Sequence, residues 1–185
     1  MKRILFVGFL LLSLMVCFTS PAWAGGLDDC KFYKEGENAL SEKGNYNYDE
    51  QYAKVLDLYT QAILTCGLSQ KDLSKVYYRS CRVWLMSWAF SNREGALGIA
   101  IADCTRAIEL DPKFTLAYIY RGSAWYYKGD YDKAIADDTT AIESGEFSQK
   151  DLSIIYNNRG LAWDKKGVQD KAKADYAKAK ELGYK

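Results

Sequence analysis

The residues with the clearest chemistry in this sequence are its cysteines. Cys17 lies near the N-terminus, and four more follow at Cys30, Cys66, Cys81 and Cys104. The sequence contains no histidine. Its absence excludes His-based acid–base catalysis, Ser–His and Cys–His nucleophile pairs and His-containing zinc sites. Oxidation of the cysteines to disulfides is the reaction that remains for these residues.

The acidic pair Asp137 and Asp138 is the other candidate for chemistry, either as a metal site or as an acid–base pair. Consecutive residues of a helix point about 100° apart, so the two carboxylates would not converge on one atom. We therefore predict a solvated surface at this pair. No glycine-rich phosphate loop occurs in the sequence. The sequence predicts no enzyme, no metal site and no cofactor.

The first residues predict the compartment of the protein. Lys2 and Arg3 precede an apolar run over 4–18, and Ala22 and Ala24 have the spacing that signal peptidase requires. We predict a signal peptide over 1–24, cut after Ala24, and a periplasmic or secreted mature chain that does not insert into a membrane. An uncleaved anchor is the alternative, although the run is shorter than the roughly 20 residues of a spanning helix.

The composition of the mature chain favours helices. Cleavage would remove Lys2 and Arg3 and leave one more acidic than basic residue. Because basic residues are not in excess, the chain lacks the positive charge that is typical of a nucleic-acid-binding protein. Proline occurs only twice, while good helix formers such as Ala, Lys and Leu are frequent. We expect a helical domain over 25–185.

An internal repeat organises that domain. The hexapeptide 69–74 recurs identically at 148–153, and residues 118–125 match residues 156–163 at their Tyr, Arg-Gly and Ala-Trp positions. Apolar or small residues recur every three to four positions, and Gly129 and Gly167 interrupt the pattern at a turn. We predict four helix hairpins, at about 30–66, 74–112, 115–145 and 153–185. Because one hairpin cannot bury its own apolar face, the four must stack.

These repeats resemble the tetratricopeptide-repeat (TPR) family over nearly the whole mature chain. The resemblance rests on residues 100–112 and 117–142, on the positions of Gly122, Tyr131, Ala134 and Ala141, and on the Leu-Asp-Pro ending at 110–112. The cysteines add some resemblance to Sel1-like repeats. The TPR resemblance implies an all-α fold, namely a right-handed superhelical solenoid of antiparallel helix hairpins.

The resemblance also implies a function. In TPR proteins the first helix of each hairpin lines a concave groove that holds an extended peptide or a partner helix. A non-enzymatic scaffold that binds a protein or peptide partner is therefore expected, and the clustered Lys34, Arg79 and Arg82 favour an acidic or C-terminal peptide. The alternative is a structural subunit that self-associates in a cell-envelope assembly. The groove residues implied here are Lys34, Asn38, Tyr78, Arg79, Arg82, Ile119, Ser123, Tyr126, Tyr127, Asn157, Leu161 and Lys165.

Extra residues interrupt the first two hairpin turns, over 45–52 and 88–95, and they carry aromatic side chains. These form either an exposed contact patch or an extension of the helices that closes the core. The aromatic residues concerned are Tyr46, Tyr48, Tyr52, Trp88 and Phe90.

The repeat register predicts which cysteines pair. When the first two hairpins are aligned to the third, Cys30 and Cys66 lie at similar distances from their turn, as do Cys81 and Cys104. Antiparallel helices bring such positions to the same height, so we predict Cys30–Cys66 and Cys81–Cys104 bridges. A Cys66–Cys81 bridge and reduced thiols remain the alternatives.

The same register predicts two ion pairs and one terminal helix. Arg121 and Asp137 lie at matching heights in the third hairpin, as do Arg159 and Asp175 in the fourth, so we expect ion pairs there, weak if they are exposed. The last helix carries lysines at 173 and 180, where the preceding repeats have apolar residues. A polar outer face is typical of the helix that ends a solenoid, so we expect four repeats to form the whole array.

Overall fold

The computed structural model describes residues 26–41 and 48–184, so the predicted signal peptide, Cys17 and Tyr46 lie outside the described residues. A short 3-10 turn, η2 (Leu27–Asp29), leads into the helices, and the described residues contain no strand. The helices are α2 (Lys31–Ser41), α3 (Tyr48–Thr65), α4 (Gln70–Ser91), α5 (Ala96–Leu110), α6 (Thr115–Lys128), α7 (Tyr131–Glu143), α8 (Gln149–Lys165) and α9 (Gln169–Glu181).

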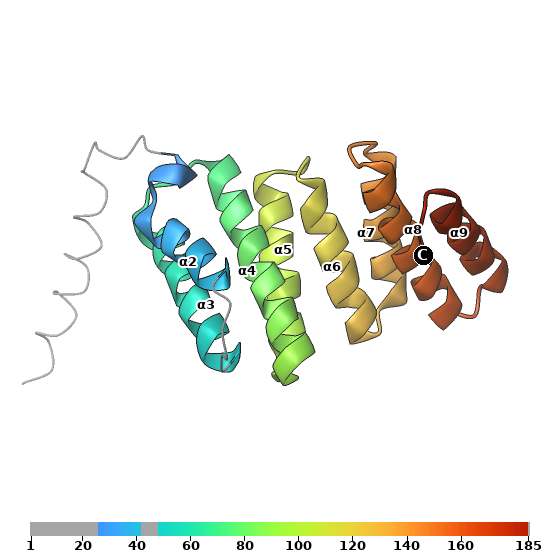
Figure 1. Cartoon of the computed structure of the whole chain (residues 1–185), viewed down its shortest axis with the longest axis horizontal. Coiled ribbons are helices and arrows are strands. Elements are labelled where there is room, and N and C mark those ends of the chain that lie inside the picture. Colours follow the sequence, from blue (N-terminus) through green and yellow to red (C-terminus); the bar gives the residue numbers. More distant parts are fainter. Residues whose placement is uncertain (1–25, 42–47, 185) are drawn as a thin grey trace, which may run out of the picture.

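The helices form hairpins that stack in chain order. Figure 1 shows α2/α3, α4/α5, α6/α7 and α8/α9 side by side along the long axis of the molecule. The two helices of each hairpin pack together, and each second helix also packs against the first helix of the next hairpin. The predicted all-α solenoid of antiparallel hairpins is confirmed. None of the helices in the described part of the chain is both long and apolar enough to cross a membrane.

The repeated hexapeptide begins a helix at each of its two positions. Ser69 accepts a hydrogen bond from the backbone N–H of Asp72, and Ser148 accepts one from Asp151 in the same way. A serine N-cap of this kind satisfies one of the free donors in the first turn. Helices α4 and α8 therefore begin at 70 and 149, four residues before the repeat boundaries at 74 and 153 that we predicted.

Small residues let the helices of each hairpin approach closely. Ala62, Ala107 and Ala141 occupy matching positions in successive second helices and are fully buried. Gly129, between α6 and α7, adopts a left-handed conformation with φ 89° that a residue with a side chain rarely takes. Larger side chains fill the core of the first two hairpins, where Tyr52 and Tyr59 are almost completely inaccessible.

Each of the first two hairpins is bridged within itself. Cys30, before α2, is bonded to Cys66 at the end of α3, and their Cα atoms are 5.7 Å apart. Cys81 of α4 is bonded to Cys104 of α5 with a Cα separation of 5.5 Å. The structure thus joins the same pairs that the repeat register predicts, and all four cysteines are buried.

The two predicted ion pairs are confirmed, but they are more buried than expected. Arg121 and Asp137 lie 2.7 Å apart with side-chain exposures of 19% and 8%. Arg159 and Asp175 lie 2.8 Å apart and are buried to a similar degree. Because both pairs lie between the helices of a hairpin, they belong to its packing rather than to its surface.

The aromatic insertions combine both predicted outcomes. Helix α4 continues to Ser91, so Trp88 and Phe90 extend the helix instead of forming a loop, and Tyr52 lies in the core. Tyr48 and Phe90 remain exposed, at 48% and 62%, and their rings stack with a centroid separation of 5.0 Å. The inserted residues therefore lengthen α4 and place Tyr52 in the core, and they also leave the exposed Tyr48–Phe90 pair at the end of the hairpin.

Candidate functional site

A trough lies between α6 and α8 on the surface formed by the first helices of the last two hairpins. Its cavity volume is about 350 Å³, and two of its apolar side chains are exposed, Leu116 at 37% and Ile154 at 42%. The lining residues recur every three to four positions on each helix, so one stripe of α6 faces one stripe of α8. The trough is lined by Leu116, Ile119, Tyr120, Ser123, Phe147, Asp151, Ile154, Ile155 and Asn158.

A smaller pocket continues from the trough, because Ser123 and Asn158 line both. Its volume is about 50 Å³. Tyr126 and Tyr127 form part of its wall, and their rings meet edge to face with centroids 5.4 Å apart. The remaining lining residues are Gly122, Asp138 and Leu161.

Asp138 is the buried acidic group of this pocket. Its exposure is 2%, and its Oδ1 atom has no hydrogen-bond partner among the described residues. Burial, followed by the neighbouring Asp137 carboxylate, raises the pKa of Asp138 well above its usual range, and the nearby Arg159 opposes that rise. Our prediction that Asp137 and Asp138 form a solvated surface is therefore wrong, because α7 is covered by helices on both sides.

The arrangement of the helices is shared with solved structures. A crystal structure of MamA, a TPR solenoid, superposes with a TM-score of 0.64 at 20% sequence identity, covering 84% of this chain and 80% of that one. The chain has the fold of a TPR solenoid. The all-α superhelical fold that its sequence predicts is confirmed by this likeness.

Curated relatives match the TPR solenoid over part of their length. The mitochondrial import receptor subunit TOM70 of Rattus norvegicus is 32% identical over 121 residues, which are 63% of this chain and 18% of TOM70. Hsp70-Hsp90 organizing protein 3 of Arabidopsis thaliana is 33% identical over 95 residues, 51% of this chain and 15% of the relative. The chain thus spans less than a fifth of either protein. No family model matches the sequence.

The groove residues predicted for the C-terminal hairpins of the TPR solenoid lie at the trough and its pocket. Ile119 and Ser123 line the trough, while Tyr126, Tyr127 and Leu161 line the pocket. The other two predicted residues, Asn157 and Lys165, belong to α8 but to neither lining.

Two of the groove residues predicted for the N-terminal hairpins, Arg79 and Arg82, already contact other side chains of the protein. Arg79 pairs with Glu37 at 3.4 Å, and Arg82 lies over the rings of Tyr78 and Tyr120 at 5.8 and 5.6 Å. Lys34 and Asn38 are exposed on α2.

Tyr78 is not an open groove position. It is only 7% exposed and packs edge-on against the rings of Phe114 and Tyr120. The ring therefore belongs to the contact between the second and third hairpins, and its assignment as an exposed groove residue is wrong.

The sequence does not predict the other residues that line the site, namely Leu116, Tyr120, Gly122, Asp138, Phe147, Asp151, Ile154, Ile155 and Asn158. One signal was available, since Ile154 and Ile155 are adjacent and α8 cannot turn both toward its core. The structure buries Ile155 to 1% exposure and leaves Ile154 in the trough. No comparable signal marks Asp138, whose environment depends on how neighbouring hairpins pack.

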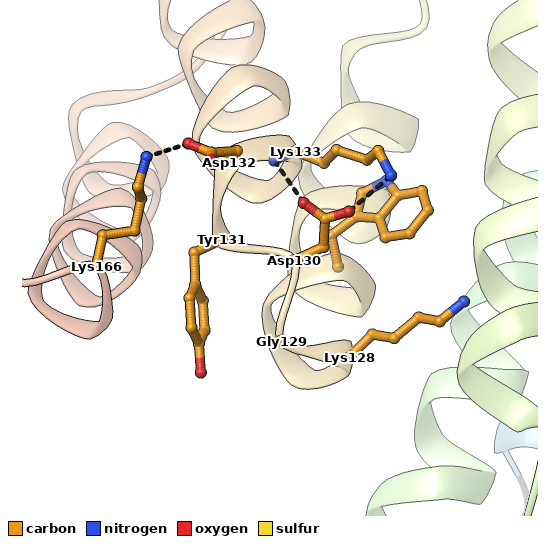
Figure 2. Close-up of a pocket in the computed structure, with 8 residues that line it drawn as sticks. Lys128, Gly129, Asp130, Tyr131, Asp132, Lys133 and Lys166 are labelled. Carbon is orange, nitrogen blue, oxygen red and sulfur yellow. Dashed lines mark hydrogen bonds and ion pairs between the residues drawn. The ribbon is translucent and has the colours of Figure 1, made fainter.

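A more open hollow lies at the turns of the third and fourth hairpins (Figure 2). Its charges are used locally: Lys133 pairs with Asp130 at 2.6 Å, and Lys166 of the fourth hairpin pairs with Asp132. The ammonium of Lys133 also lies 4.2 Å from the centroid of the Trp125 ring. Because these groups satisfy one another, the trough and its pocket are the stronger candidate site.

Proposed function

We propose that this protein is a non-enzymatic, exported scaffold that holds a protein or peptide partner in the trough between α6 and α8. The observation that carries the proposal is a set of accessible apolar side chains, with Leu116 and Ile119 on α6 and Ile154 on α8, that line a trough of about 350 Å³. Apolar side chains gathered in a concave surface are typical of binding sites. The relatives named as an import receptor and as an organizer of Hsp70 and Hsp90 support a binding role.

The partner would present apolar side chains to the trough and an acidic group beside it. Arg82 stacks on Tyr120, whose ring lines the trough, so its guanidinium borders the N-terminal side of the site. A carboxylate of an acidic side chain or of a C-terminus would complement that guanidinium. Arg79 contributes less, because Glu37 already pairs with it.

Export is supported by the N-terminal pattern and by the cysteines. The predicted cleavage after Ala24 would release a chain whose remaining cysteines are joined in two disulfides. Disulfides of this kind persist in oxidising compartments and are rare in the cytosol. We therefore place the mature protein in the periplasm or outside the cell.

Site-specific photocrosslinking tests the groove. The photoreactive residue p-benzoylphenylalanine, placed at position 119 or 154 of the mature protein, should capture the partner from an extract of the cell envelope. The matched controls are positions 102 and 136, exposed alanines of the second helices α5 and α7. Equal capture from the control positions, or capture from those positions alone, would place the binding surface outside the trough.

Self-association is the second candidate function, and the exposed Tyr48–Phe90 stack favours it. Exposed aromatic rings on a hairpin edge could meet the same rings of a second copy. Sedimentation of the mature protein over a range of concentrations decides between the two. A stable oligomer that dissociates in a Phe90→Ser variant would support the structural role, whereas a monomer at all concentrations would remove it.

A further inference from the structure

Each hairpin of the solenoid has one crossing where a residue of the second helix lies against a small residue of the first. The second-helix residue always precedes the buried alanine of its repeat by three positions. The four crossings pair Gly36 with Tyr59, Cys81 with Cys104, Gly122 with Asp138, and Gly160 with Tyr176.

In three of these crossings the side chain fills the space beside its partner. A Cβ atom on Gly36 would lie 2.7 Å from the Tyr59 ring, and one on Gly160 would lie 2.8 Å from Tyr176. The hydroxyl of Tyr59 also donates a hydrogen bond to Glu37. The second hairpin fills the same space with its disulfide. These crossings leave little room for a ligand.

The third crossing is different because Asp138 is shorter than tyrosine and is polar. Both residues of this crossing, Gly122 and Asp138, line the pocket of about 50 Å³ that opens beside the trough. The Oδ1 atom of Asp138 reaches this crossing, since a Cβ atom on Gly122 would lie 3.1 Å from it. A buried carboxyl without a partner costs free energy that an aromatic ring at the same position would not.

The two arginines near Asp138 are hydrogen-bonded to other residues, although the charge of Arg159 still acts on its carboxyl. Arg121 is held by Asp137, and Arg159 is held by Asp175 through two hydrogen bonds of 2.8 Å. An ammonium group that enters from the trough would favour the ionised form of Asp138, whose Oδ1 atom accepts no hydrogen bond from another described residue. The rings of Tyr126 and Tyr127 would flank the hydrocarbon stem and the charge of such a group.

We propose that the Asp138 pocket is a subsite for a lysine side chain of the bound partner. This inference rests on the proposed function, because it assumes that a peptide lies in the trough. The ammonium group of lysine suits a pocket of about 50 Å³ better than the larger planar guanidinium of arginine does. With Arg82 at the other side of the trough, the partner would carry an acidic group at one end and a lysine at the other.

The test uses nuclear magnetic resonance of the ¹⁵N-labelled mature protein with a capped Gly-Gly-Lys-Gly-Gly peptide. We expect saturable shifts of the amides of Tyr126, Tyr127 and Asn158. The same peptide with norleucine in place of lysine should bind at least tenfold more weakly. Asp138→Asn keeps the shape of the side chain and removes its charge, and it should weaken lysine binding by the same factor.

Asp138→Tyr is the matched variant, because tyrosine occupies the same crossing position opposite Gly36 and Gly160. It should abolish binding of the lysine peptide while the melting temperature stays equal or rises. A folded Asp138→Asn protein that binds the lysine peptide as tightly as wild type would overturn the proposal. So would equal binding of the lysine and norleucine peptides, or the absence of shifts at the pocket.

Crosslinking separates this proposal from the proposed function. If Asp138→Asn still captures the partner fully through position 154, the trough is a binding site and the lysine subsite is wrong. If position 154 captures nothing in the wild type while the lysine peptide shifts the pocket amides, the subsite exists and the assignment of the trough fails. Loss of capture in Asp138→Asn together with loss of peptide binding supports both.

Discussion

Arg121 on α6 donates two hydrogen bonds to the carboxylate of Asp137 on α7, from Nε at 2.9 Å and from Nη2 at 2.7 Å. The Nη1 atom donates a third, 3.2 Å long, to the hydroxyl of Thr105 on α5. One side chain therefore joins the two helices of its own hairpin and the preceding hairpin. Arg159 repeats the arrangement one hairpin later, with Asp175 and a threonine of α7.

Replacing Arg121 by methionine should destabilise the protein strongly. The change leaves Asp137 buried at 6% exposure without its counter-ion, and breaking a buried pair in this way costs about 3 kcal/mol. Urea unfolding followed by circular dichroism measures the loss. The control is Arg106→Met, which breaks an exposed pair with Glu109 and should change the free energy of unfolding little. Similar effects of the two changes would show that the Arg121 pair does not hold the hairpins together.

Removing either disulfide should lower the free energy of unfolding by about 3–4 kcal/mol, because the bridges close loops of 36 and 23 residues. The variants are Cys30→Ser with Cys66→Ser, and Cys81→Ala with Cys104→Ala. A reductant should destabilise the wild type. It should have no effect on a variant in which all four bridged cysteines are replaced. Non-reducing peptide mapping checks the pairing, and a Cys66–Cys81 peptide would contradict it.

The stability of the protein should depend on pH through Asp103. Burial raises its pKa to about 6, against the effect of the Ser80 hydroxyl that donates to it. Between about pH 4 and pH 6 the folded state holds a proton that the unfolded state has lost, so stability is complete below about pH 4 and falls as pH rises. In Asp103→Asn that fall, roughly 2–3 kcal/mol, should disappear. Urea unfolding at pH 4, 5, 6 and 7 tests this, and parallel curves for the two proteins would refute it.

The glycines of the solenoid should respond differently to alanine. Gly36→Ala should cost about 1–3 kcal/mol, because its Cβ would lie 2.7 Å from the ring of the fully buried Tyr59. Gly160→Ala should cost less, since Tyr176 is only partly buried and its ring can move. Gly98→Ala should stabilise α5 by about 0.5–1 kcal/mol, because the space around it is open. Thermal unfolding ranks the stabilities of the three variants. A Gly36→Ala protein as stable as wild type would contradict the close packing of Gly36 against Tyr59.

Changing both sides of the proposed binding surface should weaken partner capture. Arg82→Glu reverses the charge beside Tyr120, and Tyr126→Ala removes part of the pocket wall. We expect the double variant to lose most of its crosslinking through position 154, with an unchanged circular dichroism spectrum. A double variant that captures the partner at full strength would contradict the proposed binding surface. It would leave the exposed Tyr48–Phe90 pair as the candidate contact surface.

Relationships within a hairpin could be predicted from the sequence. The partners of Arg121 and Cys81 followed from their distance to the turn, because two antiparallel helices fix which residues face each other. The predicted repeat boundaries at about 74 and 153 lie four residues after the helix starts at 70 and 149, although the repeated Ser-x-x-Asp pattern carries the N-cap signal. Local geometry alone determines features of this kind.

Relationships between hairpins were decided only by the tertiary structure. The sequence gives no measure of how closely α6 and α8 approach, and this approach leaves Ile154 exposed and buries Asp138. Tyr78 is covered for the same reason, because Phe114 and Tyr120 of the next hairpin lie against it. The sequence by itself therefore determined the repeats, their pairing and the all-α solenoid. The trough and the unpartnered carboxyl beside it depend on the packing of side chains distant in the chain, which no local pattern encodes.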